Sequence, residues 1–271
     1  MGPQMVRASL AVIATVLFLL APQARAGHAA TAVGAKAYYL ALGDSLGFGY
    51  QPNFDFSHGY ANDLYTHLQP TAKSFTNLGC PGETSGTFIN GGCPYWYLRK
   101  TFYLGSQLSA ALSFIKSHAG QVSPVTLDLG ANDMLPLINK STCAVSSSWQ
   151  TSLSAFDTNF RLVLSRLKSQ LNGTGDLVVM NYYDPFENQC MTANPDVLAK
   201  LELFNAAIAQ DAAAYNVPVA KVFEAFGGDT TPNANPNICT DTWMCSSYND
   251  IHATTAGYSV IAGAFDSALG Y

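Results

Sequence analysis

Residues 38–46 read Tyr-Tyr-Leu-Ala-Leu-Gly-Asp-Ser-Leu, a compact apolar run directly followed by a glycine and two polar residues. An apolar run of this length that is bounded by a turn signal predicts a buried strand, here over 38–42, ending at Gly43-Asp44-Ser45. The same pattern predicts further strands at 74–78, 125–129, 177–180 and 217–222. The chain therefore has at least five segments suited to one buried sheet.

Helical patterns separate these strands. Leu108, Leu112 and Ile115 share one helix face, and longer helices are predicted over 153–167 and 198–208 and from Thr254 to the C-terminus. Strands that alternate with helices predict a central, mostly parallel sheet covered on both faces, which is a three-layer α/β/α sandwich. Because no repeat or linker follows residue 36, we expect a single domain over 37–271.

The first 26 residues have the pattern of a secretory signal peptide. Arg7 precedes an apolar run of 14 residues from Ala8 to Ala21, and residues 24–26 (Ala-Arg-Ala) match a small-x-small cleavage site. This run is shorter than the about 20 residues that a helix needs to cross a bilayer, which disfavours a membrane anchor. We therefore expect a secreted, extracellular protein that is cleaved after Ala26, with a flexible mature N-terminus over 27–36.

The charge of the chain limits its partners. The formal net charge is −5, and removing residues 1–26, which hold two arginines and no acids, changes it to −5 − 2 = −7. A mildly acidic surface is poorly suited to binding nucleic acid or an anionic membrane. We expect neither as a partner.

Six cysteines in a secreted chain indicate disulfides. Six cysteines allow 15 connectivities, and sequence proximity favours Cys80–Cys93, Cys143–Cys190 and Cys239–Cys245. The competing interpretation is a zinc site, but the chain has no C-x-x-C and no Cys/His cluster at ligand spacing. We expect three disulfides, no metal and no cofactor.

Polar residues follow three of the predicted strands, where the sites of open α/β sheets lie. They are Gly-Asp-Ser-Leu at 43–46, Gly-Cys-Pro-Gly-Glu-Thr at 79–84 and Gly-Ala-Asn-Asp at 130–133; Asn-Asp-Ile-His at 249–252 lies near the C-terminus. A serine hydroxyl becomes a nucleophile when a nearby base such as His252 takes its proton. The backbone N–H groups of Ser45 and Gly82 and the Asn132 amide can then stabilise the negative oxygen that forms. We expect Asp44 and Asp133 to hold their loops rather than to react.

The four segments resemble, in order, blocks I, II, III and V of the GDSL family of esterases and lipases, also called SGNH hydrolases. The resemblance spans residues 43–258 and implies a flavodoxin-like fold, Ser45 as nucleophile, His252 as base, and Gly82 and Asn132 as partners of the Ser45 N–H in the oxyanion hole. The sequence Gly-Asp-Ser-Leu alone is a weak indication of the family, whereas four blocks in the family's order are a strong one.

One position departs from the family pattern. The family usually has an aspartate three residues before the histidine, and this chain has Asn249 there, with Asp250 one residue later. Three groups can hold the imidazole in the orientation that a serine triad needs. They are the carboxylate of Asp250, a backbone carbonyl of residue 249 or 250, and the amide oxygen of Asn249.

The main interpretation is a carboxylic-ester hydrolase, an esterase or lipase, that forms an acyl-enzyme on Ser45. The aromatic segments 50–60 and 93–103 are typical of ordinary core or disulfide-loop packing, and the alternative is an apolar acyl or aryl pocket beside Ser45. Within the ester hydrolases, these segments favour lipase or short-chain esterase action. Deacetylation of a polysaccharide by the same mechanism is an alternative, because the family includes carbohydrate esterases. An alternative of another class is a secreted binding module without turnover, which only the asparagine at the acid position supports. We expect a monomer that acts on a small-molecule, lipid or carbohydrate ester and has no obligate protein partner.

Overall fold

The computed structural model of the protein describes residues 1–2 and 32–271. The predicted signal peptide and its cleavage site lie outside the described residues, apart from Met1 and Gly2, and so does the predicted mature N-terminus up to residue 31. Residues 32–271 belong to one compact unit. None of the described helices is long and apolar enough to cross a bilayer.

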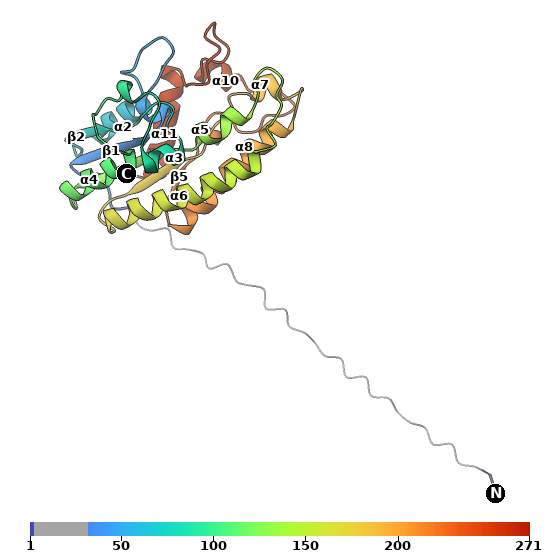
Figure 1. The fold of residues 1–271 in the computed structure, drawn as a ribbon, viewed down its shortest axis with the longest axis horizontal. Helices are drawn as coiled ribbons and strands as arrows, with labels where there is room; N and C mark the ends of the chain where they lie inside the picture. Colours follow the sequence, from blue (N-terminus) through green and yellow to red (C-terminus); the bar gives the residue numbers. More distant parts are fainter. Residues whose placement is uncertain (3–31) are drawn as a thin grey trace. The chain divides into compact units, whose positions relative to one another are not determined.

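A five-stranded sheet lies at the centre of this unit, and every neighbouring pair of its strands is parallel (Figure 1). The strand order is β2-β1-β3-β4-β5. The strands are β1 (Tyr38–Gly43), β2 (Ser74–Asn77), β3 (Val122–Asp128), β4 (Leu177–Met180) and β5 (Val219–Ala220). Almost every residue of β1, β3 and β4 is buried, as expected for strands that are covered on both faces.

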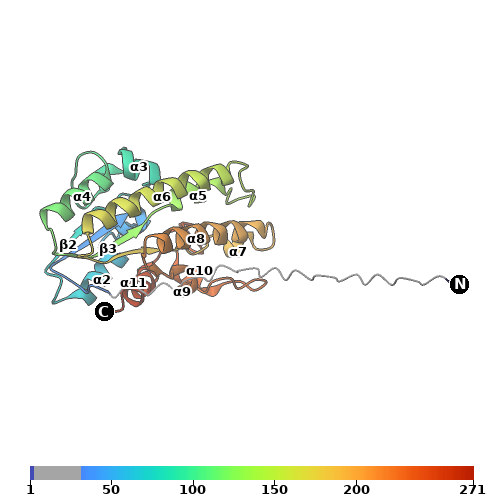
Figure 2. The same ribbon diagram turned by 90° about the horizontal axis from the view of Figure 1, so that it is seen from below.

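Helices cover both faces of the sheet and complete the predicted three-layer α/β/α sandwich (Figure 2). One layer contains α4 and α6, with α8 packed against α6, and the other contains α2 and α11. The helices are α1 (Ser45–Phe48), α2 (Tyr60–Leu68), α3 (Ser85–Asn90), α4 (Gln107–Ser117), α5 (Ala131–Met134), α6 (Trp149–Leu171), α7 (Glu187–Cys190), α8 (Asp196–Ala214), α9 (Val222–Ala225), α10 (Pro236–Asp241) and α11 (Thr255–Leu269), with short 3-10 helices η1 (Trp96–Leu98) and η2 (Leu135–Leu137).

The predicted fold class is confirmed, but two strand boundaries were wrong. β5 has only two residues, Val219 and Ala220, where 217–222 was predicted, because Val222 already begins α9. β3 begins at Val122, three residues earlier than predicted, and contains Pro124. The register between β1 and β3 shifts between Tyr38 and Leu40, which lets the strands pair around this proline.

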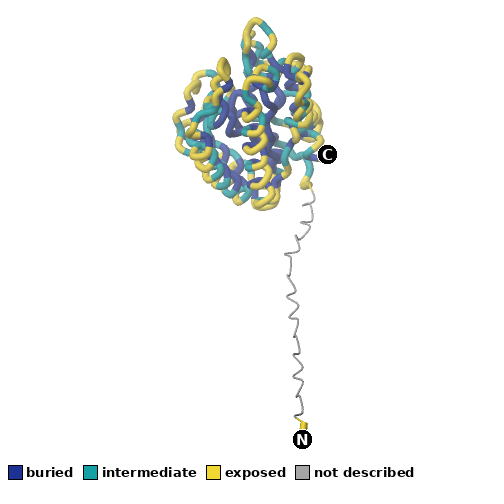
Figure 3. The backbone as a smooth tube through the Cα atoms, turned by 90° about the vertical axis from the view of Figure 1, so that its right-hand side faces the viewer, coloured by how far each residue is buried: buried dark blue, intermediate teal, exposed yellow. Residues whose placement is uncertain are grey.

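The strand order places a topological switch between β1 and β3. From β1 the chain crosses to β2 on one side, and from β2 it crosses back over β1 to β3 on the other. In open parallel sheets a crevice forms at such a switch, at the carboxyl ends of the two strands. Figure 3 shows the buried interior of the sandwich in dark blue and the exposed segments around it in yellow.

Candidate active site

Ser45 follows β1 at this crevice, in a turn that depends on Gly43. Gly43 has a φ of +136°, and a Cβ there would lie 2.2 Å from the backbone oxygen of Asp128 on the neighbouring strand. Only glycine fits so close an approach. Asp44 then caps the short helix α1, because its Oδ1 accepts the N–H of Leu46 at 2.9 Å. The Ser45 hydroxyl is therefore free of a capping role.

Asp128, the last residue of β3, holds this turn through hydrogen bonds that its carboxylate accepts. Its Oδ2 accepts the backbone N–H groups of Asp44 and Gly47, each at 3.0 Å, and its Oδ1 accepts the Tyr60 hydroxyl at 2.6 Å. Burial raises the pKa of Asp128 to about 6, and burial and the nearby Asp128 raise the pKa of Asp44 well above its ordinary value. The charge of Asp128 thus disfavours a second negative charge on Asp44, beneath Ser45.

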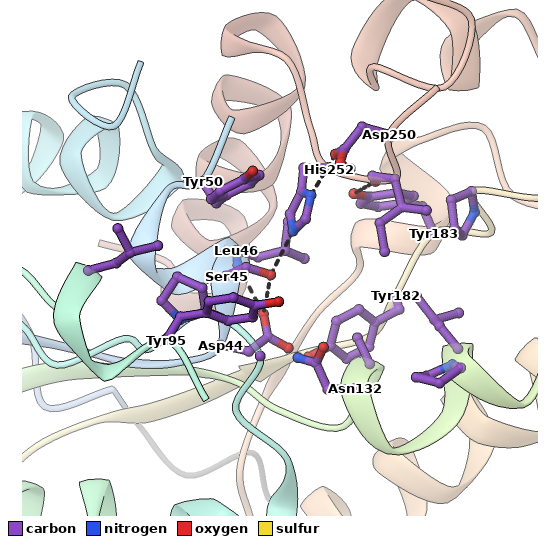
Figure 4. A pocket seen from close by; sticks show the side chains of 18 of the residues that line it. Asp44, Ser45, Leu46, Tyr50, Tyr95, Asn132, Tyr182, Tyr183, Asp250 and His252 are labelled. Carbon is purple, nitrogen blue, oxygen red and sulfur yellow. Dashed lines mark hydrogen bonds and ion pairs between the residues drawn. The ribbon is translucent and has the colours of Figure 1, made fainter. Parts of the chain in front are cut away.

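His252 contacts Ser45 across 207 residues of sequence (Figure 4). Its Nε2 lies 2.8 Å from the Ser45 Oγ, and its Nδ1 lies 2.6 Å from Oδ1 of Asp250. The same Oδ1 accepts the backbone N–H of His252 at 2.9 Å, so the carboxylate is held against the ring from two sides. Tyr50 packs on the imidazole, with ring centroids 4.6 Å apart.

Asp250, and not Asn249, contacts the imidazole. Asn249 is exposed and lies outside the cavity, and no carbonyl of residue 249 or 250 bonds to His252. Burial raises the pKa of Asp250, but its hydrogen bonds and charge interaction with His252 outweigh this effect and leave the pKa below the ordinary value. Asp250 is therefore ionised at neutral pH and can stabilise an imidazolium.

Gly82 and Asn132 lie beside Ser45 and line the same cavity. In the described part of the chain, the backbone N–H groups of Ser45 and Gly82 have no hydrogen-bond acceptor, whereas the N–H of Gly79 is bound by Asn77. The Asn132 amide donates one hydrogen to the Glu83 carbonyl at 3.1 Å and has a second hydrogen to offer. These groups can converge on one oxygen atom of a substrate.

Contacts between distant loops hold these donors in place. Asp133 accepts the N–H and the hydroxyl of Ser85, so it joins the loop after β3 to the loop after β2, in the structural role expected of it. Gln107 of α4 bonds both backbone groups of Gly43 and also Glu83. Gln107 carries no motif, and sequence reasoning did not identify it.

The cavity above Ser45 has a volume of about 660 Å³ and mostly apolar walls. Figure 4 shows Tyr50 and Tyr95 on one side of the Ser45–His252 pair and Asn132, Tyr182 and Tyr183 on the other. The sequence predicts that the aromatic loops and the loop over 134–150 fold over the site, but it does not predict the residues that follow β4. The apolar members of this second wall are Leu135, Pro136, Ile138, Tyr182, Tyr183, Pro185 and Phe186.

Three disulfides brace the loops of the site, and their pairing is the one that sequence proximity favoured. Cys80–Cys93 closes the loop that contains Gly82, Cys239–Cys245 lies just before His252, and Cys143–Cys190 joins segments next to the second wall. One group of possible metal ligands, Cys80, Glu83 and Cys93, was found among the described residues. Its two cysteines are bonded to each other, which leaves a single carboxylate to bind an ion.

A serine, a histidine and a carboxylate in series at the floor of an apolar cavity define a site of the serine hydrolase class. The chain belongs to the GDSL-like lipase/acylhydrolase family, whose model matches residues 41–260. The resemblance of the four sequence blocks is thus confirmed, and with it the class of carboxylic-ester hydrolases. No curated protein sequence matches the chain significantly.

Solved structures confirm the fold. An acetylxylan esterase, Axe2 from Geobacillus stearothermophilus, superposes with a TM-score of 0.58 at 16% identity, covering 88% of this chain and 96% of Axe2. The protein TesA matches with a TM-score of 0.52 at 16% identity, covering 86% and 97% of the two chains. LAE5, an alpha/beta hydrolase enzyme from the metagenome of Lake Arreo, Spain, matches with 0.52 at 18% identity, covering 88% and 96%.

Proposed function

We propose that this enzyme hydrolyses carboxylic esters with Ser45 as nucleophile, His252 as general base and Asp250 as the group that orients His252. The continuous hydrogen-bonded series from Asp250 through His252 to Ser45 carries this proposal. Its 2.8 Å and 2.6 Å distances are those of an assembled nucleophile and base. Because a carboxylate contacts the imidazole, the absence of an acid at position 249 no longer supports a binding module without turnover.

In the first half of the reaction, Ser45 Oγ attacks the ester carbonyl carbon while its proton moves to His252 Nε2. The carbonyl oxygen becomes negative and accepts hydrogen bonds from the N–H groups of Ser45 and Gly82 and from the Asn132 amide. When this intermediate collapses, the carbon–oxygen bond to the alcohol breaks and His252 gives its proton to the alcohol. An acyl group then remains on Ser45.

In the second half, water takes the place of the alcohol. His252 removes a proton from the water as its oxygen attacks the acyl carbon, and the same three donors hold the second oxyanion. Collapse returns the proton to Ser45 Oγ and releases the acid. Asp250 stays ionised throughout and stabilises the imidazolium that forms in each half.

The cavity favours esters with an apolar acyl or aryl group. A volume of about 660 Å³ lies within the range of cavities that hold molecules of drug size, and an acetyl group would leave most of it empty. The acetylxylan esterase shares the fold at 16% identity, so deacetylation of a polysaccharide is the second candidate substrate class. We also propose that the protein acts outside the cell, since disulfides persist in oxidising compartments. The monomer expected from the sequence stays a prediction.

Covalent labelling with an organophosphonate ester tests the nucleophile. Intact-mass analysis is expected to show one adduct on the wild-type protein and none on Ser45→Ala, because only an activated serine reacts. An adduct that persists in Ser45→Ala would place the nucleophile elsewhere. Absence of labelling and of ester turnover in the wild-type protein would support the binding module.

A substrate panel distinguishes the two candidate substrate classes. We expect kcat/KM for nitrophenyl esters to rise from acetyl to medium-length acyl groups as the apolar walls become covered. Acetylated xylan is expected to release little acetate under the same conditions. A preference for acetyl esters together with rapid deacetylation of the polymer would establish the carbohydrate esterase instead.

A further inference from the structure

Large apolar side chains are exposed on two segments that line or adjoin the cavity. We call this group the apolar rim; its members are 48% to 80% exposed and are Phe54, Tyr95, Trp96, Tyr97, Phe102 and Leu104. Five of them lie in one segment, residues 95–104. Soluble proteins seldom gather so much exposed apolar surface unless it contacts something.

The apolar rim is continuous with the wall of the cavity. Phe54, Tyr95 and Tyr97 line the cavity and are also exposed, so their rings extend from the interior to the surface. Trp96 adjoins Tyr97, with ring centroids 6.1 Å apart, and lies outside the cavity, as do Phe102 and Leu104. A surface that covers the apolar rim would therefore also cover the entrance to Ser45.

Phe54 has an unusual backbone conformation at the position where its ring is exposed to solvent. Phe54 has a φ of +66°, a left-handed conformation that bulky residues seldom adopt. Its N–H bonds to the Gln51 carbonyl at 3.0 Å, and its ring lies 6.1 Å from that of Phe56, which also lines the cavity. A strained residue that presents an aromatic ring to solvent beside a binding site suggests a role in binding.

The geometry of the rings favours an acyl layer over a sugar chain. A sugar ring stacks on an aromatic face, so a flat polymer surface is best matched by aromatic faces that share a plane. Here the Trp96 and Tyr97 planes differ by 84° and those of Tyr95 and Tyr97 by 73°. Phe54, Phe102 and Leu104 also lack polar side-chain atoms that could bond to hydroxyl groups. An acyl layer needs neither common planes nor hydrogen bonds.

The charges near the apolar rim also suit an uncharged lipid surface. Residues 91–106 contain no acid, and their two cations face aromatic rings of the protein itself: Lys100 Nζ lies 5.0 Å from the centroid of the Phe48 ring. Arg99 stacks at 4.0 Å over the buried Tyr103. Asp55, next to Phe54, is already bonded to Ser57 and His58. Because the whole chain is acidic, attraction to the lipid must come from apolar burial.

We propose that the apolar rim docks the enzyme on the surface of aggregated lipid, with Trp96, Phe102 and Leu104 inserted at the interface and the cavity mouth facing the layer. Esters of the layer would then reach Ser45 without crossing water. The benefit to turnover rests on the proposed ester hydrolase function, whereas the docking itself does not.

Binding to vesicles and turnover of a soluble ester separate these two claims. The test variant combines Trp96→Ser, Phe102→Ser and Leu104→Ser, none of which lines the cavity, and the matched control combines Leu162→Ser and Leu203→Ser on the exposed faces of α6 and α8. With phosphatidylcholine vesicles in co-sedimentation, we expect the test variant to lose about tenfold or more in partitioning and the control to match the wild type. Soluble nitrophenyl acetate should be hydrolysed equally by all three proteins, and an emulsified long-chain ester more slowly by the test variant alone.

Several results would overturn the docking proposal. The first is that the wild-type protein does not partition onto the vesicles. The second is that the test variant partitions like the wild type, and the third is that the control variant loses as much partitioning as the test variant. Binding to insoluble acetylated xylan that only the test variant loses would assign the apolar rim to a polymer, and a dimer that only the test variant dissociates would assign it to a second copy of the chain. If the wild type binds vesicles but cleaves no ester, docking stands and the hydrolase proposal fails.

Discussion

Asn249 has a left-handed backbone, with a φ of +45°, which asparagine tolerates better than most residues. Its N–H bonds to the Ser246 carbonyl at 3.1 Å, which closes a turn directly before Asp250. Through this turn, Asp250 reaches His252 Nδ1 from two positions before the histidine. The asparagine at the family's usual acid position thus shapes the turn, and its neighbour Asp250 is the carboxylate that contacts the imidazole.

Separate substitutions at the two positions test this division. We expect Asp250→Asn to lower kcat/KM for a soluble ester by between about 10²- and 10⁴-fold, because the imidazolium loses its charged partner. Asn249→Gly should retain activity within about twofold, since glycine adopts the same backbone conformation. Steady-state kinetics on both purified variants decide the matter. Comparable losses in both variants, or none in Asp250→Asn, would contradict the assignment.

Asn132 offers a second test at the level of single residues. We expect Asn132→Ala to reduce kcat by about 10²- to 10³-fold with little change in KM, because the amide stabilises an oxygen that is negative only in the transition state. Asn90→Ala is a suitable control, since its side chain is exposed on α3, donates to the Gly86 carbonyl at 2.9 Å and lies outside the cavity. A rise in KM without a fall in kcat would instead indicate that Asn132 binds the ground state.

The residues of the site lie on loops that follow the strands, and disulfides and hydrogen bonds hold these loops in place. The His252 loop is held by Cys239–Cys245, by the pairing of Thr242 with Ala253, and by a bond from the Trp243 N–H to the His252 carbonyl at 3.0 Å. The other two disulfides brace the Gly82 loop and the second wall. Each disulfide thus supports a different part of the cavity.

Removing the disulfides should separate stability from activity. Cys143–Cys190 closes 47 residues and Cys239–Cys245 only 6, so replacing each pair by serines should cost about 4 and about 2 kcal/mol of unfolding free energy respectively. Activity below the melting temperature should change in the opposite order, because the shorter bridge supports the loop of His252, the proposed general base. Denaturant unfolding and nitrophenyl ester kinetics measure the two effects. The same order in both would show that the bridges act only through global stability.

For the molecule as a whole, buried carboxyl groups make folding sensitive to pH. Burial raises the pKa of Asp184 to about 7, and one of its oxygens has no hydrogen-bond partner in the described chain. The pKa of an aspartate in the unfolded chain is about 3.9. Between these values the folded state holds a proton that the unfolded state has lost, so this group lowers stability as pH rises toward and through 7.

Asp184→Asn should remove this effect. The asparagine can still accept the Phe186 N–H, which Asp184 binds at 2.8 Å, and it carries no charge at any pH. We expect the variant to be more stable than the wild type at pH 8, by up to about 4 kcal/mol, and similar to it at pH 4. Thermal unfolding across this range measures the difference, with the exposed Asp196→Asn as control. A gain of equal size at both pH values would point to packing rather than charge.

The sequence by itself determined the sandwich, the parallel sheet and four of the residues that meet at its edge: Ser45, Gly82, Asn132 and His252. Periodicity identifies strands and helices because it reflects which face of each element is buried. Once the sheet is parallel, the carboxyl ends of its strands must share one edge, so polar motifs at those ends gather there. Proximity along the chain favoured the disulfide pairing that the structure has, but the structure was needed to choose it among 15 connectivities.

Only the tertiary structure decided which group holds His252, how short β5 is, that Gln107 joins β1 to the Gly82 loop, and which residues after β4 line the cavity. The Gln107 contacts and the cavity walls depend on how segments far apart in sequence pack against one another. The Asp250 contact depends on the turn at Asn249, and the length of β5 depends on where α9 begins. Tyr182 and Tyr183 illustrate the difference, since their sequence is that of any strand end and their position beside Asn132 exists only after β3 and β4 have paired.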